Sequence, residues 1–316
     1  MLNLHTYVLP DGRLNPSKIS KQELLYKGNN GKFVERFYVN ESQSYIFKPL
    51  TNVDRMGSEM WVFEHIMPSL PQVYPKILAS SSDSDPDRYW IIMEDLGVLD
   101  HTHDRETILS IVTAIAKWHA TPTESLNHAP LAGPKPSVSK MKEELLTAKQ
   151  KDIELLIDQL PYAAPSINIV ISAMKRYAES DEMVLCHGDL HAGNFARQAD
   201  RVVVLDWEHT HVNTRFWDLF HALDISHPTW ARHSSAPFRK EAIDVYIDHV
   251  QSFTGKRLDR QAFWQEYITI ASIFSLWMLL LIKNDLISNT DKWPKVALEQ
   301  QFQETMRTLM ECAAAL

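Results

Sequence analysis

Apolar and polar residues alternate over short distances through most of the first third of the chain. From Glu23 onward this pattern predicts two strands joined by a glycine-containing turn, a third strand, one helix with an apolar stripe, and two more strands. The strands cover residues 23–26, 33–39, 44–48, 73–78 and 89–93, and the helix covers residues 58–66. Residues 1–20 show no clear period and are interpreted as an irregular lead-in.

Beyond Leu96 the apolar positions recur at helical spacing instead. Helices are expected over residues 106–119, 139–160 and 167–177, and again from Phe216 to the C-terminus, while strand-like runs return only at residues 183–186 and 202–206. The simplest organisation is an α+β chain of two lobes. Residues 1–96 form an N-terminal lobe built on an antiparallel sheet with one main helix, and residues 97–316 form a larger, mostly helical lobe.

Composition and charge limit the classes of function. The chain has 316 residues and a net charge of −8, which argues against binding to nucleic acid or to an anionic membrane. The apolar stretch from Ile268 to Ile282 is shorter than the roughly twenty residues that span a bilayer, so it predicts a buried helix. The N-terminus lacks a secretory pattern, and a cytoplasmic location without membrane contact is expected. Two cysteines make no disulfide framework, and Cys186 is interpreted as a buried thiol.

The most informative segment is Leu-Cys-His-Gly-Asp-Leu-His-Ala-Gly-Asn at residues 185–194. It places Asp189 and Asn194 on one loop, and a β-branched run then ends at a second acid, Asp206. Phosphoryl transfer needs a carboxylate that orients and deprotonates an attacking hydroxyl, and oxygen ligands for Mg²⁺. The spacing therefore predicts Asp189 as the catalytic base, with Asn194 and Asp206 as magnesium ligands.

Each of these residues also has a structural interpretation. Asp189 and Asn194 are both common in turns, and Asp206 is placed where it would cap a strand. An acid directly after Val-Val-Val-Leu is costly to bury without a cation, which favours the metal site. His187 is expected to hold the loop in shape by hydrogen bonding to backbone. For His191 the same two roles, structural support and acid–base chemistry, are open, and the sequence favours neither as clearly.

Lys48 near the end of the third predicted strand is the candidate for contacting the α- and β-phosphates of a nucleotide. A lysine in that place is more often a solvated surface charge. It would need an acidic partner, and the following helix offers Glu59 and Glu64 on different faces. Glu59 is favoured because it lies nearer the start of the helix.

Three further candidates have weaker signals. Gly28 and Gly31 bound a turn whose N–H groups are candidates for contacting phosphates, although an ordinary hairpin turn explains them equally well. The backbone of Glu94 and Leu96, just after a buried strand, is a candidate partner for an adenine edge. Asp218 begins a predicted helix and is interpreted as an N-cap-type anchor that supports the catalytic loop without binding metal.

These residues resemble the aminoglycoside phosphotransferase and choline kinase group of the protein-kinase-like fold. The resemblance covers approximately residues 24–223 and no more of the chain. Residues 187–194 look like the catalytic loop of that group, 205–208 like its metal-binding segment, 218–219 like the anchor that follows, and 91–96 like its inter-lobe hinge. The helix that carries Glu59, followed by Tyr-Pro-Lys-Ile at 74–77, also fits the pattern and supports Glu59 as the partner of Lys48.

The resemblance implies a protein-kinase-like fold and a nucleotide-binding N-terminal lobe. It also implies transfer of the γ-phosphate of ATP, with Mg²⁺, to a hydroxyl of a small molecule. An aminoglycoside, a choline-like amine, a sugar and a related metabolite all remain open as acceptor. The acids Glu208, Asp224 and Asp285 suggest an amine-bearing acceptor, a hypothesis built on charge alone. A eukaryotic-type protein kinase fits less well, because Asp206-Trp207-Glu208 replaces Asp-Phe-Gly and no Ala-Pro-Glu follows.

Two other classes of function compete with this one. A catalytically silent kinase-fold protein that serves as a binding or coat component would usually lack one of the lysine, base or metal residues, and all are present here. A metallohydrolase built on His187, His191, His209 and His211 is disfavoured, because His-x-x-x-His on a loop does not aim both rings at one zinc ion. The choice between ATP and GTP and the oligomeric state leave no signal in the sequence.

Overall fold

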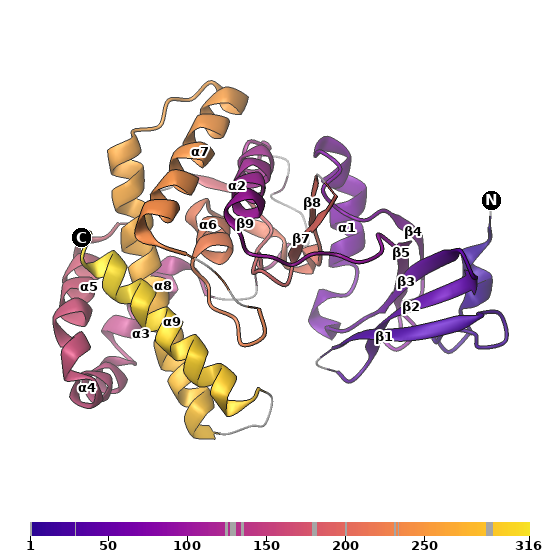
Figure 1. Ribbon diagram of the computed structural model, residues 1–316, viewed down its shortest axis with the longest axis horizontal. Helices are drawn as coiled ribbons and strands as arrows, with labels where there is room; N and C mark the ends of the chain where they lie inside the picture. Colours follow the sequence, from indigo (N-terminus) through magenta and orange to yellow (C-terminus); the bar gives the residue numbers. More distant parts are fainter. Residues whose placement is uncertain are drawn as a thin grey trace. The chain divides into compact units, whose positions relative to one another are not determined.

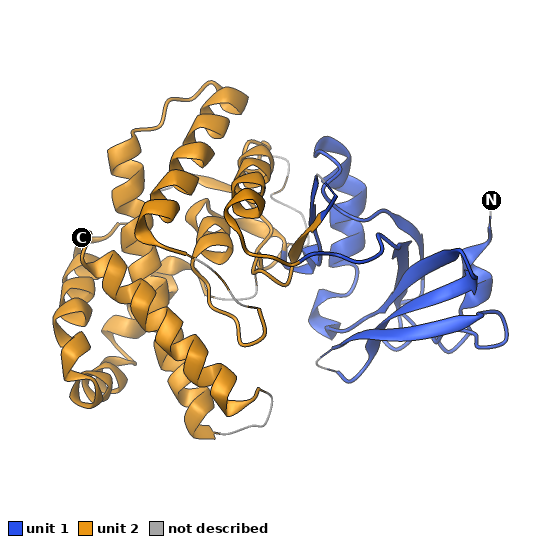
Figure 2. Ribbon diagram, viewed as in Figure 1, with its two compact units in different colours: residues 1–100, 198–209 blue, residues 101–197, 210–316 orange. Residues whose placement is uncertain are grey.

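The chain is described by a computed structural model (Figure 1). The described residues are 2–28, 30–123, 126, 131–133, 136–178, 182–199, 201–230, 232, 234–288 and 293–316. They form two compact units, coloured separately in Figure 2. Unit 1 comprises residues 1–100 and 198–209, and unit 2 comprises residues 101–197 and 210–316. The domain boundary expected near Leu96 stays a prediction.

Unit 1 is built on a five-stranded antiparallel sheet in the order β1-β2-β3-β5-β4. The strands are β1 (Lys21–Lys27), β2 (Phe33–Asn40), β3 (Gln43–Pro49), β4 (Ile77–Ser80) and β5 (Trp90–Glu94), with helix α1 (Ser58–His65) between β3 and β4. The expected sheet with one main helix is therefore confirmed. Its core is formed by apolar side chains on one face, among them Phe37, Phe47, Trp90 and Ile92.

The alternation of β3 places its lysine on the opposite face from the core. Successive side chains of a strand point to opposite faces of the sheet. Phe47 is 2% exposed and packs in the core, so Lys48 points to the other face, opposite Ile91 in the register of β3 and β5. The hydrophobic pattern of a single strand thus fixes the side of the sheet on which the candidate lysine lies.

The fourth strand of unit 1 begins later than the sequence pattern predicts. A strand was expected over residues 73–78, but β4 spans Ile77–Ser80. Pro75 has no N–H to donate to a neighbouring strand. In addition, the carbonyl of Val73 accepts a hydrogen bond from Val204 N at 2.5 Å, which pairs this residue with a different segment of unit 1.

Unit 2 is mostly helical, as expected. Its helices are α2 (Arg105–His119), α3 (Val138–Leu146), α4 (Gln150–Gln159), α5 (Ala164–Arg176), α6 (Phe216–Leu223), α7 (Ala236–Thr254), α8 (Arg260–Ser288) and α9 (Lys295–Ala313). The single helix predicted over residues 139–160 is in fact α3 and α4. The break falls at Thr147, whose backbone leaves the helical region (φ −126°, ψ −85°) and whose hydroxyl donates to the Glu143 carbonyl.

Two short strands were missed. Strand β6 (Met183–Cys186), which was expected, pairs with β9 (His211–Thr214), which was not. In β9 the polar His211 and Asn213 are buried while Val212 is 39% exposed, the reverse of the pattern by which a strand is recognised. Strands β7 (Phe195–Gln198) and β8 (Arg201–Val204) form a second two-stranded sheet, and the sequence pattern predicts no strand at β7.

Helix α8 contains the apolar stretch that was predicted to be a buried helix. By length and composition it is the one helix in the described chain that could cross a membrane. However, 61% of its most apolar window is buried inside the protein, and the core helix of a soluble protein passes the same test. Its buried side chains include Tyr267 and Phe274, which pack against Phe216 and Phe220 of α6.

Candidate active site

In unit 1, three acids surround the ammonium group of Lys48. Lys48 Nζ lies 2.6 Å from Glu59 Oε2, 2.6 Å from Asp206 Oδ1 and 3.9 Å from Glu208 Oε2. Of the two acids considered on α1, the one that contacts Lys48 is Glu59. Lys48 comes from β3, Glu59 from α1, and the other two acids from the segment that follows β8. The fold therefore assembles this group from three separate parts of the sequence.

The electrostatics of this acidic cluster, defined as Lys48, Glu59, Asp206 and Glu208, are unbalanced. Burial alone would lower the pKa of Lys48, but the three carboxylates outweigh it and hold that pKa well above its usual value. Burial and the neighbouring Asp206 raise the pKa of Glu208 to about 7. One ammonium thus faces three carboxylates in a partly buried setting, so an additional cation would be stabilised there.

The conformation of Asp206 adds to this picture. Its φ is +61°, in the left-handed region that few residues other than glycine adopt. Residues held in such a conformation cost free energy and cluster at functional sites. Oxygens of Glu59, Asp206 and Glu208 all lie within 4.8 Å of one another, a spacing that suits a metal ion. Because the Asp206 side chain is 37% exposed, a ligand can reach it.

The predicted catalytic loop, residues 187–194, lies in unit 2, between β6 and β7. The Asp189 side chain is 27% exposed. A group that accepts a proton from a substrate must be at least partly exposed. Asn194 Nδ2 donates to the Asp189 carbonyl at 2.7 Å, and Asn194 N donates to the His191 carbonyl at 2.8 Å. The side-chain N–H of Asn194 is therefore bonded within the loop, and no described residue donates to the side-chain oxygen. That oxygen has the chemistry expected of a magnesium ligand.

His187 supports this loop from inside. Its ring Nδ1 accepts a hydrogen bond from the backbone N–H of Asp189 at 3.3 Å, and the residue is 0% exposed. The part expected of His187, hydrogen bonding to backbone to hold the loop, matches this contact. His191 makes a similar contact, because its Nδ1 accepts from Gly193 N at 3.0 Å.

Asp218 fastens the loop to the helical core, but it is not the helix cap that was expected. It lies inside the first turn of α6, where the N-cap residue is Arg215. Its buried carboxylate accepts hydrogen bonds from His187 N at 2.8 Å, Gly188 N at 3.0 Å and Trp118 Nε1 at 2.9 Å. The carboxylate therefore holds the backbone just before Asp189 instead of the N-terminus of its own helix.

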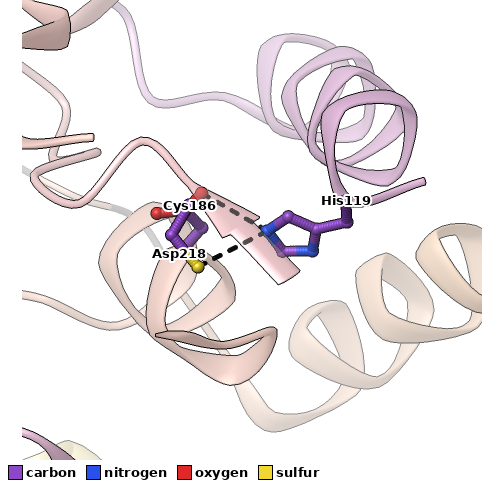
Figure 3. Close-up of side chains that lie close together, drawn as sticks. All are labelled: His119, Cys186 and Asp218. Atoms are coloured by element: carbon purple, nitrogen blue, oxygen red, sulfur yellow. Dashed lines mark hydrogen bonds and ion pairs between the residues drawn. The ribbon is translucent and has the colours of Figure 1, made fainter. Parts of the chain in front are cut away.

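Two residues that support Asp218, His119 and Tyr246, were not identified from the sequence. Figure 3 shows His119 of α2 beside Asp218 and Cys186, with His119 Nε2 3.3 Å from Asp218 Oδ2 and 4.0 Å from Cys186 Sγ. Tyr246 Oη donates to the other ring nitrogen of His119 at 2.8 Å. His119 follows Trp118 at the end of an amphipathic helix, and nothing in its local pattern signals a partner so far along the chain.

The titration behaviour of this anchor follows from its burial. Burial lowers the pKa of His119, although the neighbouring Asp218 opposes this, and burial raises the pKa of the Cys186 thiol well above its usual value. Burial would raise the pKa of Asp218, but His119, His187 and the N–H of Gly188 outweigh it and lower that pKa. A neutral imidazole, a thiol and a hydrogen-bonded carboxylate fit a closed structural network.

The remaining candidates occupy ordinary structural positions. The N–H groups of Gly28 and Gly31 donate within their own turn, to Lys32 O at 2.8 Å and Gly28 O at 3.0 Å. Glu94 N donates to Lys76 O at 2.9 Å, and the Leu96 carbonyl accepts from Gln198 Nε2 at 2.5 Å. In both places part of the backbone is already engaged, and the roles in nucleotide binding stay predictions.

One acid suggested for an amine-bearing acceptor is not available to it. Asp224 is 1% exposed, and its oxygens accept two hydrogen bonds from Arg239, each 2.7 Å long. Its charge is therefore neutralised inside unit 2, which removes it from the argument for a cationic acceptor.

The catalytic loop and Asp206 lie within the region that a family model matches. The model, described as a phosphotransferase enzyme family, matches residues 35–255. The chain belongs to this family. This phosphotransferase is therefore a member of an enzyme family that acts on small molecules, and it carries the β-sheet and helical units of that family's kinase-like fold. A search of curated proteins gave no significant match.

Solved structures agree on the fold of this phosphotransferase. A mutant aminoglycoside 2'-phosphotransferase with GDP bound is 14% identical, with a TM-score of 0.63 and 92% of each chain covered. A putative aminoglycoside phosphotransferase from Ralstonia eutropha is 13% identical, with a TM-score of 0.61, covering 98% of this chain and 95% of the other. A spectinomycin phosphotransferase with ADP and spectinomycin is 13% identical, with a TM-score of 0.57 and 93% of each chain covered.

Proposed function

We propose that the protein transfers the γ-phosphate of ATP to a hydroxyl group of a small molecule, with Asp189 as the catalytic base. The observation that carries this proposal is the loop around Asp189. Its carboxylate is partly exposed, its backbone N–H donates to His187 Nδ1, and its backbone carbonyl accepts from Asn194 Nδ2. A base in that position accepts the proton of the acceptor hydroxyl as the oxygen attacks phosphorus. A cytoplasmic location is part of the proposal, since ATP is abundant there.

Lys48 is assigned to the α- and β-phosphates of the nucleotide. Its side chain is only 11% exposed, and its ammonium group is oriented by Glu59, so that it presents a fixed charge. Solved relatives of the same fold contain GDP or ADP, which supports a nucleotide as one substrate. Glu94 and Leu96 are assigned to the base of that nucleotide, and the turn of Gly28 and Gly31 to its phosphates.

Asn194 and Asp206 would hold the magnesium ion. The donor set fits, because an amide oxygen with no described donor and a partly exposed carboxylate in an over-acidic cluster are both hard oxygen ligands. When bound, Mg²⁺ neutralises charge on the phosphate oxygens of the nucleotide. Glu208 adds a further carboxylate beside Asp206, which strengthens the preference of this place for a cation.

The experiment that tests the proposal measures ATP consumption with Mg²⁺ across a panel of hydroxylated metabolites and aminoglycosides. We expect turnover with one class of compound, and a loss of about 10²- to 10⁴-fold in Asp189→Ala. Asp158→Ala, which removes an exposed acid on α4, is the matched control and should retain full turnover. Turnover that was equal in Asp189→Ala and the wild-type protein would refute the assignment of the base.

A further inference from the structure

Two aromatic side chains from the segment between α6 and α7 lie against the catalytic loop. The ring of His227 stacks on that of His191, with centroids 4.4 Å apart and planes 22° apart. Trp230 covers Gly193 so closely that a Cβ atom at that glycine would lie 2.2 Å from Trp230 Nε1. Since backbone and indole leave no room for a side chain, Gly193 is needed for this approach.

The start of this segment is held rigidly by the helices of unit 2. Asp224, at the end of α6, accepts two hydrogen bonds from Arg239 of α7 and one from the hydroxyl of Tyr267 of α8. Ser226 O then accepts from Gln301 Nε2 of α9 at 2.8 Å. The backbone immediately before His227 is therefore fixed by three helices.

The end of the segment is held by α9. Arg232 Nη2 donates to the Glu304 carbonyl at 3.1 Å and to Thr308 Oγ1 at 2.5 Å. Glu304 in turn accepts from the Ser226 hydroxyl at 2.6 Å. Support of this kind is what holds a binding side chain in one position.

The exposed parts of these rings suit an uncharged partner. His227 and Trp230 are both half-buried. Burial, with a smaller contribution from His191, lowers the pKa of His227 to about 3, so the ring is neutral at physiological pH. Its Nδ1 accepts from Thr229 N at 3.1 Å, which places the proton on Nε2. No described residue accepts a hydrogen bond from His227 Nε2 or Trp230 Nε1.

Together these rings form a wall, defined as His191, His227 and Trp230, with Trp293 against its outer edge. The rings of His227 and Trp293 meet edge to face at 5.5 Å. Among the described residues, Asp189 is the acid beside the wall, with its Oδ2 atom 3.8 Å from His191 Nε2. Asp224, the acid within the same segment, is neutralised by Arg239. Within the part of the chain that the structure describes, a polycationic acceptor would therefore meet one partly exposed carboxylate at the wall, that of the proposed base.

We propose that this wall binds the acceptor, and that the acceptor is an uncharged hydroxylated ring whose apolar face lies on His227 and Trp230. The inference rests on the proposed function and names the class of its second substrate. Aromatic faces bind the C–H face of such a ring, while the two ring N–H groups donate to its oxygens. The hydroxyl to be phosphorylated then projects beyond the wall towards Asp189.

The test compares acceptors and variants by steady-state kinetics with MgATP. The neutral ring probes are myo-inositol, ribose and adenosine, and the cationic probes are choline and kanamycin. We expect turnover with a neutral ring, and a rise of about tenfold or more in its KM in Trp230→Ala and His227→Ala while kcat stays within about threefold. Trp230→Phe, which keeps an aromatic face, should recover most of the loss.

His249→Ala is the matched control, because His249 also stacks on an aromatic ring, but that ring belongs to Phe253 of the same helix, α7. It should leave the acceptor KM unchanged. The thermal shift produced by MgATP reports in each variant that the protein is folded and binds nucleotide. This readout separates loss of acceptor binding from loss of structure.

Two outcomes would overturn the inference while leaving the proposed function intact. One is turnover with choline or kanamycin and none with the neutral rings. The other is a fall in kcat at unchanged KM in both alanine variants, which would mean that the rings position Asp189 and do not bind the acceptor. Absence of turnover in the wild-type protein with every probe would overturn the proposed function, and the wall would lose its role with it.

Discussion

The two clusters of ionisable groups in this chain differ in how far their charges are satisfied. Around Lys48, three carboxylates share one ammonium group, and two of the three are partly exposed. Around Asp218, one fully buried carboxylate receives four donors, from Trp118, His119 and the backbone of His187 and Gly188. The first cluster is short of positive charge, whereas the second is complete.

That difference distinguishes a candidate ligand site, the cluster around Lys48, from a structural support, the cluster around Asp218. A buried carboxylate whose oxygens are all hydrogen-bonded has no capacity left for a ligand, so its value lies in the geometry that it fixes. A partly exposed group of like charges stays unfavourable until a cation reaches it. His119, Cys186 and Asp218 also have the spacing of a metal site, but the existing hydrogen bonds explain their closeness without an ion.

The largest expected effect is on activity, at Asp206. Asp206→Ala should lower kcat/KM by about 10³-fold, on the order of 4 kcal/mol, because it removes a proposed metal ligand. The protein should stay folded, since Glu59 and Glu208 still neutralise Lys48. Steady-state kinetics with MgATP measures the loss, and Asp54→Ala, an exposed acid of unit 1, serves as control. A loss of less than tenfold would contradict the distinction between the clusters.

The next effect is on stability, at Asp218. Asp218→Asn keeps the shape but turns an N–H₂ group towards donors, so the free energy of unfolding should fall by about 3 kcal/mol. The lowered pKa of Asp218 gives a sign to the pH dependence. Its contribution is fully present above the unfolded value of 3.8 and is lost as the pH falls through the lower folded value.

Urea unfolding across pH measures this contribution, with Asp158→Asn as control. The difference between wild-type and Asp218→Asn proteins should be constant near neutral pH and should shrink below pH 3.8. Equal stability of the two proteins at neutral pH would mean that the anchor does not hold the fold.

The sequence was informative about the site where chemistry and chain spacing coincide. Asp189, Asn194 and Asp206 could be proposed as site residues because a loop and the strand after it carry them within a short stretch, and their roles stay predictions. Glu59 was preferred over Glu64 from its place on α1, and it is the acid that contacts Lys48. The five-stranded sheet followed from period-two alternation, which burial on one face imposes on a strand.

The sequence carried no signal for features that depend on contacts between distant parts of the chain. His119 lies 99 residues from Asp218, and no local pattern links an imidazole at the end of one helix to a carboxylate in the first turn of another. Strand β9 has buried polar and exposed apolar residues, so its pairing with β6 decides its structure. The wall depends on contacts between a segment after α6 and helix α9, which spacing along the chain cannot predict.

The smallest expected effect has the opposite sign from that at Asp218, and for this reason it tests the comparison most directly. Glu208→Gln removes one of the crowded carboxylates but keeps an amide that can contact Asn52. In the presence of EDTA the variant should be more stable than the wild-type protein by about 1 kcal/mol, or roughly 2 °C in Tm, since like charges are relieved. Glu64→Gln, an exposed acid of α1 outside the cluster, should leave Tm unchanged. A lower Tm in Glu208→Gln would show that the carboxylates of the acidic cluster are as well neutralised by their partners as that of Asp218. The excess of carboxylates would then be no argument for a bound cation.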